Sequence, residues 1–293
     1  MSIRELVKRL AVAALGIPLA VGIVYLGGWP LALPAALFSG LGARELCRLG
    51  KAQGVEAFPW LCIPGAVGLV LLAGLTRSYG AFAPPALALV LIVFVLSAVG
   101  AIWRRWPGDR PLPAVSLTTA GVLYLGGGLS FAVLLRHLPE TPDWTGWNGP
   151  LQGPLLLLFP LAVTWTGDTA AYFFGHLFGI RRLIPHVSPG KTVTGAVAGL
   201  ITSAITGAAM GWLALGLHPE PLASALEGGG LGFLLGLVSQ VGDLVESVFK
   251  REAGVKDSGV IFPGHGGILD RFDALLISLP AAYVLIRLLG ALR

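Results

Sequence analysis

Residues Ser239 to Asp273 read SQVGDLVESVFKREAGVKDSGVIFPGHGGILDRFD and lie between two long apolar runs. The stretch carries six acidic and four basic residues, although only 12% of the whole chain is charged. An ionisable side chain at membrane depth is costly and usually marks a functional site. The stretch therefore indicates a membrane protein whose chemistry is concentrated near its C-terminal end.

Composition supports a membrane location for the whole chain. Of its 293 residues, 55% are hydrophobic, and the mean hydropathy is +0.81. Soluble domains carry about 25% charged residues, roughly twice the fraction found here. The 42 glycines and 21 prolines are spread through apolar runs, as is common in transmembrane helices. We therefore predict an all-α, polytopic integral membrane protein.

The cysteines and the net charge argue against a zinc-binding, a disulfide-stabilised or a nucleic-acid-binding protein. Cys47 and Cys62 lack CxxC spacing, so they provide neither a zinc site nor a disulfide framework. A net charge of +5 and a pI near 9.5 could indicate nucleic-acid binding. In a membrane protein, cytoplasmic loops rich in lysine and arginine explain the same charge, so we expect no nucleic-acid partner.

Nine apolar runs approach the length of about 20 residues that a membrane-spanning helix needs. They lie at about 10–27, 30–46, 58–76, 81–103, 112–135, 151–175, 192–217, 226–246 and 268–290. We expect the first run to be an uncleaved span, because no convincing cleavage site follows it. The chain divides into an N-terminal region, 1–150, with about five spans, and a C-terminal region, 151–293, with about four.

The distribution of basic residues predicts the orientation. With nine spans and a cytoplasmic N-terminus, 16 of the 20 lysines and arginines fall inside and four fall outside. Such an excess is typical of cytoplasmic loops. The charged stretch and the Arg181–Lys191 segment then share the cytoplasmic face, and we expect a multi-pass protein of the cell inner (cytoplasmic) membrane.

Two sets of carboxylates are spaced for metal binding. Asp243, Glu246 and Lys250 share one helix face at spacings i, i+3 and i+7, and Asp270 and Asp273 repeat the i, i+3 spacing. Mg²⁺ is usually held by one or two carboxylates plus substrate phosphates, so we expect these side chains to hold it. The alternative is ordinary salt bridging, such as Asp243 with Lys250 or Asp270 with the neighbouring arginine.

Glycines and isolated polar residues mark further candidate positions. Gly264-His265-Gly266-Gly267 follows a proline, and its glycines allow backbone amides to approach a phosphate. For His265, two interpretations remain equally open: it contacts the substrate phosphates, or it is an ordinary surface histidine. Asp168 and three nearby threonines form a polar stripe in an apolar run; it either faces the same cavity or makes interhelical hydrogen bonds.

The segment Ser188-Pro189-Gly190-Lys191-Thr192 contains the Gly-Lys-Thr sequence that ends a phosphate-binding P-loop motif. The P-loop motif requires a glycine five residues before the Gly-Lys-Thr glycine, and position 185 is proline. We therefore exclude a P-loop, although Lys191 can still bind phosphate as a point charge.

Together these blocks resemble the signature of the phosphatidate cytidylyltransferases, also called CDP-diacylglycerol synthases. The matching blocks are Asp168-x-x-Ala171-Tyr172, Ser188-Pro189-x-Lys191-Thr192, Ser239 to Ser247, Ser247-x-x-Lys250-Arg251, Lys256-Asp257, Pro263 to Gly267 and Asp270-Arg271-x-Asp273. The N-terminal half is similar only in its hydrophobicity. Two positions depart from the family pattern, because Gly190 and Thr194 stand where a lysine and a glutamate are usual.

The resemblance implies that CTP and phosphatidate react to give CDP-diacylglycerol and diphosphate, in phospholipid biosynthesis. It implies Mg²⁺, as two divalent ions or as one with a monovalent cation, held by Asp243 and Asp270 with Glu246 and Asp273 in support. Lys250 and Arg271 would take part in catalysis beside the two aspartates. Substrate and phosphate binding would fall to Ser188, Lys191, Thr192, Arg251, Lys256, Gly264, His265, Gly266 and Gly267, supported by Asp168, Asp257 and Ser247.

Two other classes remain open from the residues. One is another CTP-using membrane enzyme, such as a polyprenol or isoprenoid-lipid kinase or a cytidylyltransferase for a different lipid. The other is an ion-coupled transporter, which also keeps carboxylates in the membrane but is expected to show inverted repeats that are not visible here. A homodimer is compatible with every one of these classes.

Overall fold

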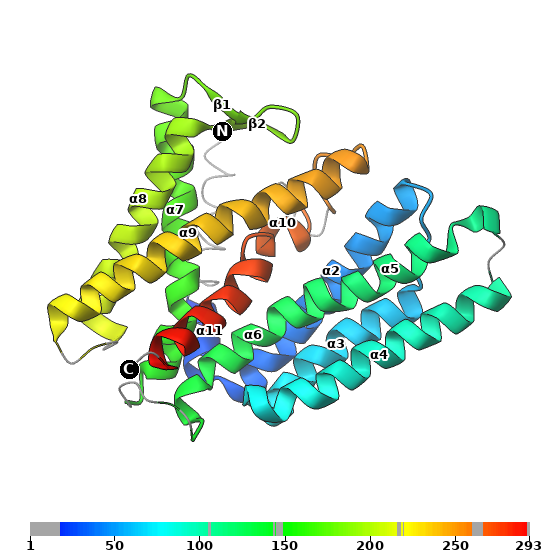
Figure 1. The fold of residues 1–293 in the computed structure, drawn as a ribbon, viewed down its shortest axis with the longest axis horizontal. Helices are drawn as coiled ribbons and strands as arrows, with labels where there is room; N and C mark the ends of the chain where they lie inside the picture. Colours follow the sequence, from blue (N-terminus) through cyan, green and yellow to red (C-terminus); the bar gives the residue numbers. More distant parts are fainter. Residues whose placement is uncertain are drawn as a thin grey trace.

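The computed structural model describes residues 18–104, 107–142, 144, 149–215, 218, 220–259 and 266–291. These residues are almost entirely helical (Figure 1). Seven segments are long and apolar enough to cross a membrane: Pro59–Thr76, Tyr79–Trp103, Pro111–Arg136, Gln152–Phe178, Val193–Leu215, Pro221–Glu252 and Leu269–Ala291. The predicted polytopic helical architecture is thus confirmed.

The first two predicted spans stand apart from these seven. The run at 10–27 falls mainly outside the described residues, and its described part, 18–26, is helical. The second run is helix α2 (Gly28–Ala52), whose C-terminal part carries Arg44, Glu45 and Arg48. These charges lower its hydropathy, so α2 is a helix of spanning length without being one of the seven apolar candidates.

Helices from the first half of the chain run side by side as a bundle (Figure 1). Its members, with two short 3₁₀ turns, are α2, α3 (Pro59–Thr76), α4 (Tyr79–Arg104), η1 (Pro107–Asp109), α5 (Pro111–Gly121), η2 (Val122–Gly127), α6 (Gly128–Arg136) and η3 (Leu138–Glu140). The π-helical segment η2 joins α5 and α6 into one span. Fully buried leucines such as Leu69, Leu125 and Leu135 fill the bundle interior.

A second group of helices carries the candidate site. It comprises α7 (Gln152–Phe178), β1 (Arg182–Ile184), β2 (Ser188–Thr192), α8 (Val193–Met210), η4 (Gly211–Leu215), α9 (Pro221–Glu252), α10 (Leu269–Phe272) and α11 (Leu275–Ala291). The two strands pair antiparallel as a hairpin that projects beyond the ends of α7 and α8 (Figure 1). Helix α11 packs against both α6 and α9, and it therefore connects the second group to the first bundle.

Glycines allow α8 and α9 to approach backbone to backbone. A Cβ placed on Gly207 would lie 2.2 Å from the carbonyl oxygen of Gly228, and one on Gly228 would lie 2.3 Å from that of Gly207. Small residues at such crossings are a common basis of helix association in membranes. The glycine-rich start of α9 is therefore a packing surface, which explains how a predicted span can begin with three glycines.

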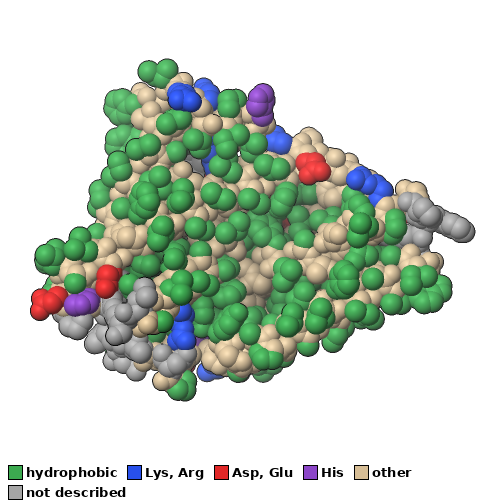
Figure 2. Space-filling view, in the orientation of Figure 1, with side chains coloured by type: hydrophobic (Ala, Val, Ile, Leu, Met, Phe, Trp, Pro, Cys, Tyr) green, Lys and Arg blue, Asp and Glu red, His purple; other side chains and the backbone are tan. Residues whose placement is uncertain are grey.

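The outer surface suits lipid. Hydrophobic side chains cover most of the face shown in Figure 2, and the charged ones gather toward its margins. Large apolar side chains such as Ile180, Leu213 and Phe173 are strongly exposed, at 94%, 80% and 56% of their surface. In water this exposure would be a liability, whereas in a bilayer it is the ordinary outer face of a helix bundle.

Candidate functional site

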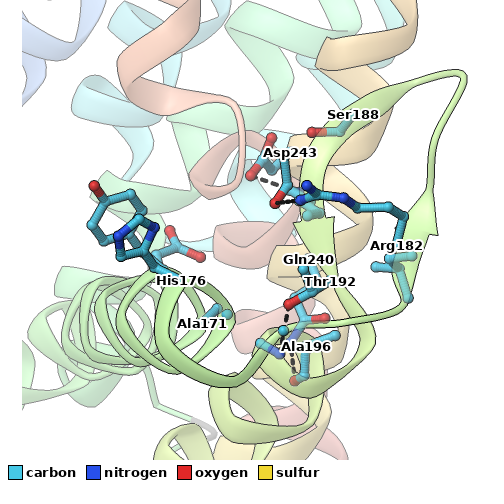
Figure 3. A pocket seen from close by; sticks show the side chains of 16 residues that line it. Ala171, His176, Arg182, Ser188, Thr192, Ala196, Gln240 and Asp243 are labelled. Carbon is cyan, nitrogen blue, oxygen red and sulfur yellow. Dashed lines mark hydrogen bonds and ion pairs between the residues drawn. The ribbon is translucent and has the colours of Figure 1, made fainter.

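A cavity of about 610 Å³ lies between α7, the β-hairpin, α8 and α9 (Figure 3). Tyr172, His176 and Arg182 contribute to its wall, together with Gln240 from α9. Five of the predicted site residues also line it, namely Asp168, Ser188, Lys191, Thr192 and Asp243. The cavity thus brings together the polar stripe of α7, the Ser-Pro-Gly-Lys-Thr segment and the start of the charged stretch.

An ion pair joins the two motif segments across this cavity. The Lys191 Nζ atom lies 2.7 Å from Asp243 Oδ2, and the two side chains keep 25% and 31% of their surface exposed. Both side chains are therefore held in place and are only partly exposed, and the Lys191 ammonium nitrogen itself is buried. The contact confirms that the hairpin and α9 lie on the same end of the molecule, although about fifty residues separate them in sequence.

The position of Lys191 follows from the way that β2 passes into α8. Thr192 has an extended backbone and is 3% exposed, and its Oγ1 accepts a 3.1 Å hydrogen bond from the amide of Gly195. This is an N-cap, which ends the strand and starts the helix. On the adjacent turn, Gln240 Nε2 donates to the Ala196 carbonyl at 2.9 Å and ties α9 to α8. Thr192 therefore orients Lys191 toward the cavity.

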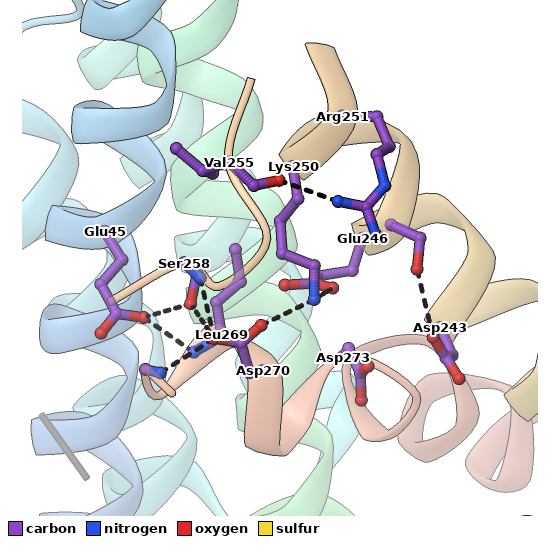
Figure 4. Close-up of polar contacts among 12 residues, drawn as sticks. Glu45, Asp243, Glu246, Lys250, Arg251, Val255, Ser258, Leu269, Asp270 and Asp273 are labelled. Carbon is purple, nitrogen blue, oxygen red and sulfur yellow. Dashed lines mark hydrogen bonds and ion pairs between the residues drawn. The ribbon is translucent and has the colours of Figure 1, made fainter. Parts of the chain in front are cut away.

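A second polar cluster lies where α9 meets α10 (Figure 4). Lys250 Nζ lies 2.6 Å from Asp270 Oδ1 and also forms an ion pair with Glu246. All three side chains are largely enclosed, at 13%, 8% and 0% exposed. A buried charge without a partner is strongly destabilising, so Lys250 makes the burial of both carboxylates tolerable. Lys250 thus pairs with Asp270 and Glu246, while Asp243 pairs with Lys191.

The second oxygen of Asp270 organises the segment between α9 and α10. Asp270 Oδ2 accepts hydrogen bonds from the Ser258 amide, the Ser258 hydroxyl and the Gly267 amide, each 2.8 Å long. The Gly267 amide, which we expected to contact phosphate, is therefore bonded to Asp270 here. Both oxygens of Asp270 have protein partners, and its role as a direct metal ligand stays a prediction.

Sequence reasoning missed Glu45, which joins this cluster from α2 (Figure 4). Glu45 is 1% exposed, and its carboxylate accepts hydrogen bonds from Ser258 and from the start of α10. A signal was present in the sequence. Glu45 falls at helical spacing with Gly42 and Leu49, both of which are buried, so it lies on the buried face of α2.

The remaining predicted residues lie around the two polar clusters. Arg251 donates to the backbone carbonyls of Val187 at 3.3 Å and Val255 at 3.1 Å, so it ties α9 to the hairpin. Ser247 donates to Asp243 at 3.4 Å. Three are exposed near the end of α9 or on α10, namely Lys256, Asp257 and Arg271, and Gly266 is partly buried beside Asp270. Gly264 and His265 lie outside the described residues.

Three carboxylates from different elements lie close to one another, and two of them, Asp168 and Asp243, line the cavity. Asp168, Asp243 and Asp273 come from α7, α9 and the α10–α11 junction, and their charges interact with one another. Carboxylate oxygens are the ligands that Mg²⁺ prefers, so this donor set fits the ion. In the described ranges, no three acidic, histidine or cysteine side chains group around a single point. The arrangement therefore fits an ion held by one or two carboxylates and completed by substrate phosphates.

The two departures from the family pattern have different surroundings. Gly190 lines the cavity, and a Cβ added there would meet no atom within 4 Å. A side chain can therefore begin at this position without a clash. Thr194 Oγ1 donates to the Phe178 carbonyl at 3.5 Å and belongs to the junction between the hairpin and α7.

These features define a polytopic membrane protein with a pocket of cations and carboxylates at one end of its helices. The chain belongs to the cytidylyltransferase family, whose sequence pattern matches residues 7–289. The family resemblance predicted from the motif blocks is thereby confirmed.

Individual relatives extend over most of the chain. A phosphatidate cytidylyltransferase of Synechocystis is 33% identical over 96% of this chain and 97% of its own length. A Bacillus subtilis protein of the same name is 30% identical over 91% of this chain and 92% of its own length. The uncharacterized protein YnbB of Escherichia coli is 36% identical over 86% of this chain and 77% of its own length.

Proposed function

We propose that this protein is a phosphatidate cytidylyltransferase, which makes CDP-diacylglycerol and diphosphate from CTP and phosphatidate. The observation that carries the proposal is the cavity in which Lys191 from the hairpin faces Asp243 from α9. A cation for phosphate and a carboxylate for a divalent ion are the two groups that a nucleotide triphosphate requires. The Synechocystis and Bacillus subtilis relatives support phosphatidate as the acceptor.

The proposed reaction balances without a change of oxidation state. A phosphate oxygen of phosphatidate forms a bond to the α-phosphorus of CTP. The bond between that phosphorus and the oxygen bridging to the β-phosphate breaks, and diphosphate leaves with the electron pair. The attacking phosphate is already anionic at neutral pH, so no general base is needed. The main obstacle is repulsion between two polyanions, which a site overcomes by positioning and charge neutralisation.

The side chains of the cavity suit this task. Lys191 is partly exposed and would bind phosphate oxygens of CTP, and Arg182 adds a second cation to the wall. Lys250 lies deeper, where it neutralises Asp270 and Glu246 and keeps α9 and α10 together. The lipid would enter from the bilayer side, since α7 carries exposed apolar side chains such as Trp165 and Phe173 next to the cavity.

Asp243, which lines the cavity, would hold Mg²⁺, and Asp168 and Asp273 lie near enough for their charges to interact with it. Bound there, Mg²⁺ would neutralise charge on the reacting phosphates. Asp243 would then share its negative charge between Lys191 and the ion. The Lys191 ion pair keeps the Asp243 carboxylate oriented toward the cavity before the substrates arrive.

The test uses purified protein with phosphatidate vesicles, Mg²⁺ and CTP labelled either at the α- or at the γ-phosphate. We expect the α-label to appear in lipid and the γ-label in diphosphate. Asp243→Asn should lower this turnover at least about a hundredfold, since it removes a major electrostatic group while keeping size. Asp109→Asn, on the distant turn η1, is the matched control and should change turnover little.

Other outcomes would contradict the proposal. Release of CDP with transfer of the γ-label to lipid would identify a CTP-dependent lipid kinase. Transfer of the α-label to a polyprenyl phosphate but not to phosphatidate would identify a cytidylyltransferase with a different acceptor. Near-normal turnover by Asp243→Asn would remove Asp243 from the reaction and would place the site elsewhere.

A further inference from the structure

Glu45 reaches from the N-terminal half of the chain to the segment that contains Asp270. Its Oε1 accepts a 3.1 Å hydrogen bond from the Ile268 amide, and its Oε2 accepts a 2.9 Å bond from the Leu269 amide. These amides lie at the start of α10, where backbone donors have no partner within the helix. A carboxylate that is 1% exposed therefore satisfies donors that would otherwise be buried and unpaired.

Ser258 links Glu45 to Asp270 directly. Its Oγ lies 3.0 Å from Glu45 Oε2 and 2.8 Å from Asp270 Oδ2. A hydroxyl group has a single proton, so it can donate fully to only one of these carboxylates at a time. Any change at Glu45 therefore alters the hydrogen bond available to Asp270, and the effect passes on to Lys250 through its 2.6 Å contact with Asp270.

The fit around Glu45 leaves no space for other side chains. A Cβ on Gly259 would lie 2.4 Å from Glu45 Oε1, and a Cβ on Gly267 would lie 2.4 Å from both Glu45 oxygens. Either contact is far shorter than real side chains tolerate. The last glycine of the Gly-His-Gly-Gly segment is thus required by the position of the Glu45 carboxylate.

We propose that Glu45 is a positioning residue, which fixes Asp270 and its partner Lys250 by holding Ser258 and the start of α10 against α2. It does not touch the cavity substrates and acts through Ser258 and the start of α10. The kinetic consequence of this inference rests on the proposed cytidylyl transfer, whereas the structural consequence does not. The two can therefore be tested separately on the same protein.

The structural test is hydrogen exchange of the purified full-length protein in detergent. In Glu45→Gln, we expect the amides of Ile268 and Leu269 to exchange about tenfold faster or more, because charged acceptors are stronger than neutral ones. Glu56→Gln is the matched control; Glu56 is exposed and pairs with Lys51 at the other end of the loop after α2. Unchanged exchange at Ile268 and Leu269 in Glu45→Gln would overturn the proposal.

A second variant covers the case in which Glu45→Gln does not fold. Glu45→Asp keeps the charge but withdraws it by one methylene group, and it is expected to fold and to show the same local rise in exchange. If Glu45→Asp folds and its exchange at Ile268 and Leu269 equals that of the unchanged protein, the proposal is wrong, because the reach of Glu45 would not matter.

The kinetic test is a double-mutant cycle with Ser258→Ala, measured per folded molecule. We expect Glu45→Gln to lower kcat about tenfold with a smaller change in KM for CTP, and to have much less effect when Ser258 is already alanine. Additive effects, or a loss of thermal stability at unchanged kcat, would reduce Glu45 to a structural role and contradict the proposal. If no cytidylyl transfer occurs at all, the proposed function fails, and the exchange measurement still decides whether Glu45 positions Asp270.

Discussion

Lys191 is the residue whose position most directly connects the sequence to the chemistry. The N-cap formed by Thr192 sets where β2 ends, and Lys191 consequently points to Asp243 instead of toward solvent. The neighbouring Gly190 has open space around it. Position 190 therefore adds no charge where the family pattern usually has a lysine, and the electrostatic field of the cavity depends on Lys191 and Arg182.

This dependence predicts the effects of two substitutions, one that removes a lysine from the cavity and one that adds a lysine to it. Lys191→Gln should raise the CTP concentration needed for half-maximal turnover on the order of tenfold, since it removes one charge-assisted phosphate contact. Adding Gly190→Lys to that variant should recover part of the loss, because position 190 lines the cavity and a Cβ there meets no atom within 4 Å. Turnover measured across CTP concentrations checks both expectations.

A cation remote from the cavity provides the control. Lys51→Gln removes an exposed lysine that pairs with Glu56, and it should leave the CTP requirement unchanged. An equal effect of Lys191→Gln and Lys51→Gln would mean that only the overall positive charge matters. Failure of Gly190→Lys to recover any activity would mean that position 190 does not face the nucleotide.

At the scale of elements, the end of α6 is bound to the start of α2 by a small polar cluster. The Gly28 amide donates to His137 Nε2 at 2.9 Å, and His137 Nδ1 contacts Glu140 at 2.8 Å. Arg136 donates to the carbonyls of Val24 and Tyr25 at 2.8 and 2.7 Å. Nε2 can accept the Gly28 proton only when it carries none itself, so this cluster requires neutral His137.

Burial lowers the pKa of His137 below its ordinary value of 6.5, although its hydrogen bond with Glu140 acts in the opposite direction. A histidine with a lowered pKa in the folded state binds its proton more readily when unfolded. The stability that His137 contributes is therefore fully present above about pH 6.5 and is lost as the pH falls toward the folded-state pKa.

The expected result is a pH-dependent difference between two proteins. Thermal unfolding in detergent between pH 8 and pH 5 should show the unchanged protein losing stability below about pH 6.5. His137→Gln keeps a hydrogen-bonding side chain but cannot titrate, so its stability should fall less over this range. Parallel curves for the two proteins would show that His137 does not set this pH dependence.

At the scale of the whole molecule, apolar length and charge spacing were enough to predict the helical membrane architecture and five of the residues that line the cavity. Lys191 and Asp243 were each expected near phosphate or metal, and they meet in the structure. The contact of Lys250 with Glu246 follows from helical spacing, whereas its contact with Asp270 could not be predicted, because spacing within α9 does not orient α10. Helical spacing with Gly42 and Leu49 could have placed Glu45 on the buried face of α2, but its partners, more than 200 residues away, could not be predicted.

The arrangement of the helix ends bears on the orientation of the molecule in its membrane. The hairpin and the C-terminal ends of α2 and α9 lie toward one side in Figure 1, whereas the ends of α6 and α11 lie toward the other. The first side carries Lys51, Arg182, Lys191 and Arg251. Basic residues favour the cytoplasmic side, so we predict that this side, with the cavity, faces the cytoplasm.

Single-cysteine labelling of intact cells tests this prediction. Both natural cysteines are buried, so an added one supplies the reactive thiol. Glu252→Cys, exposed at the end of α9, should react with a membrane-impermeant maleimide only after the cells are opened. Pro142→Cys, exposed after η3 on the opposite side, should react in intact cells. If Glu252→Cys but not Pro142→Cys were labelled in intact cells, the predicted orientation would be wrong. The cavity would then face away from cytoplasmic CTP.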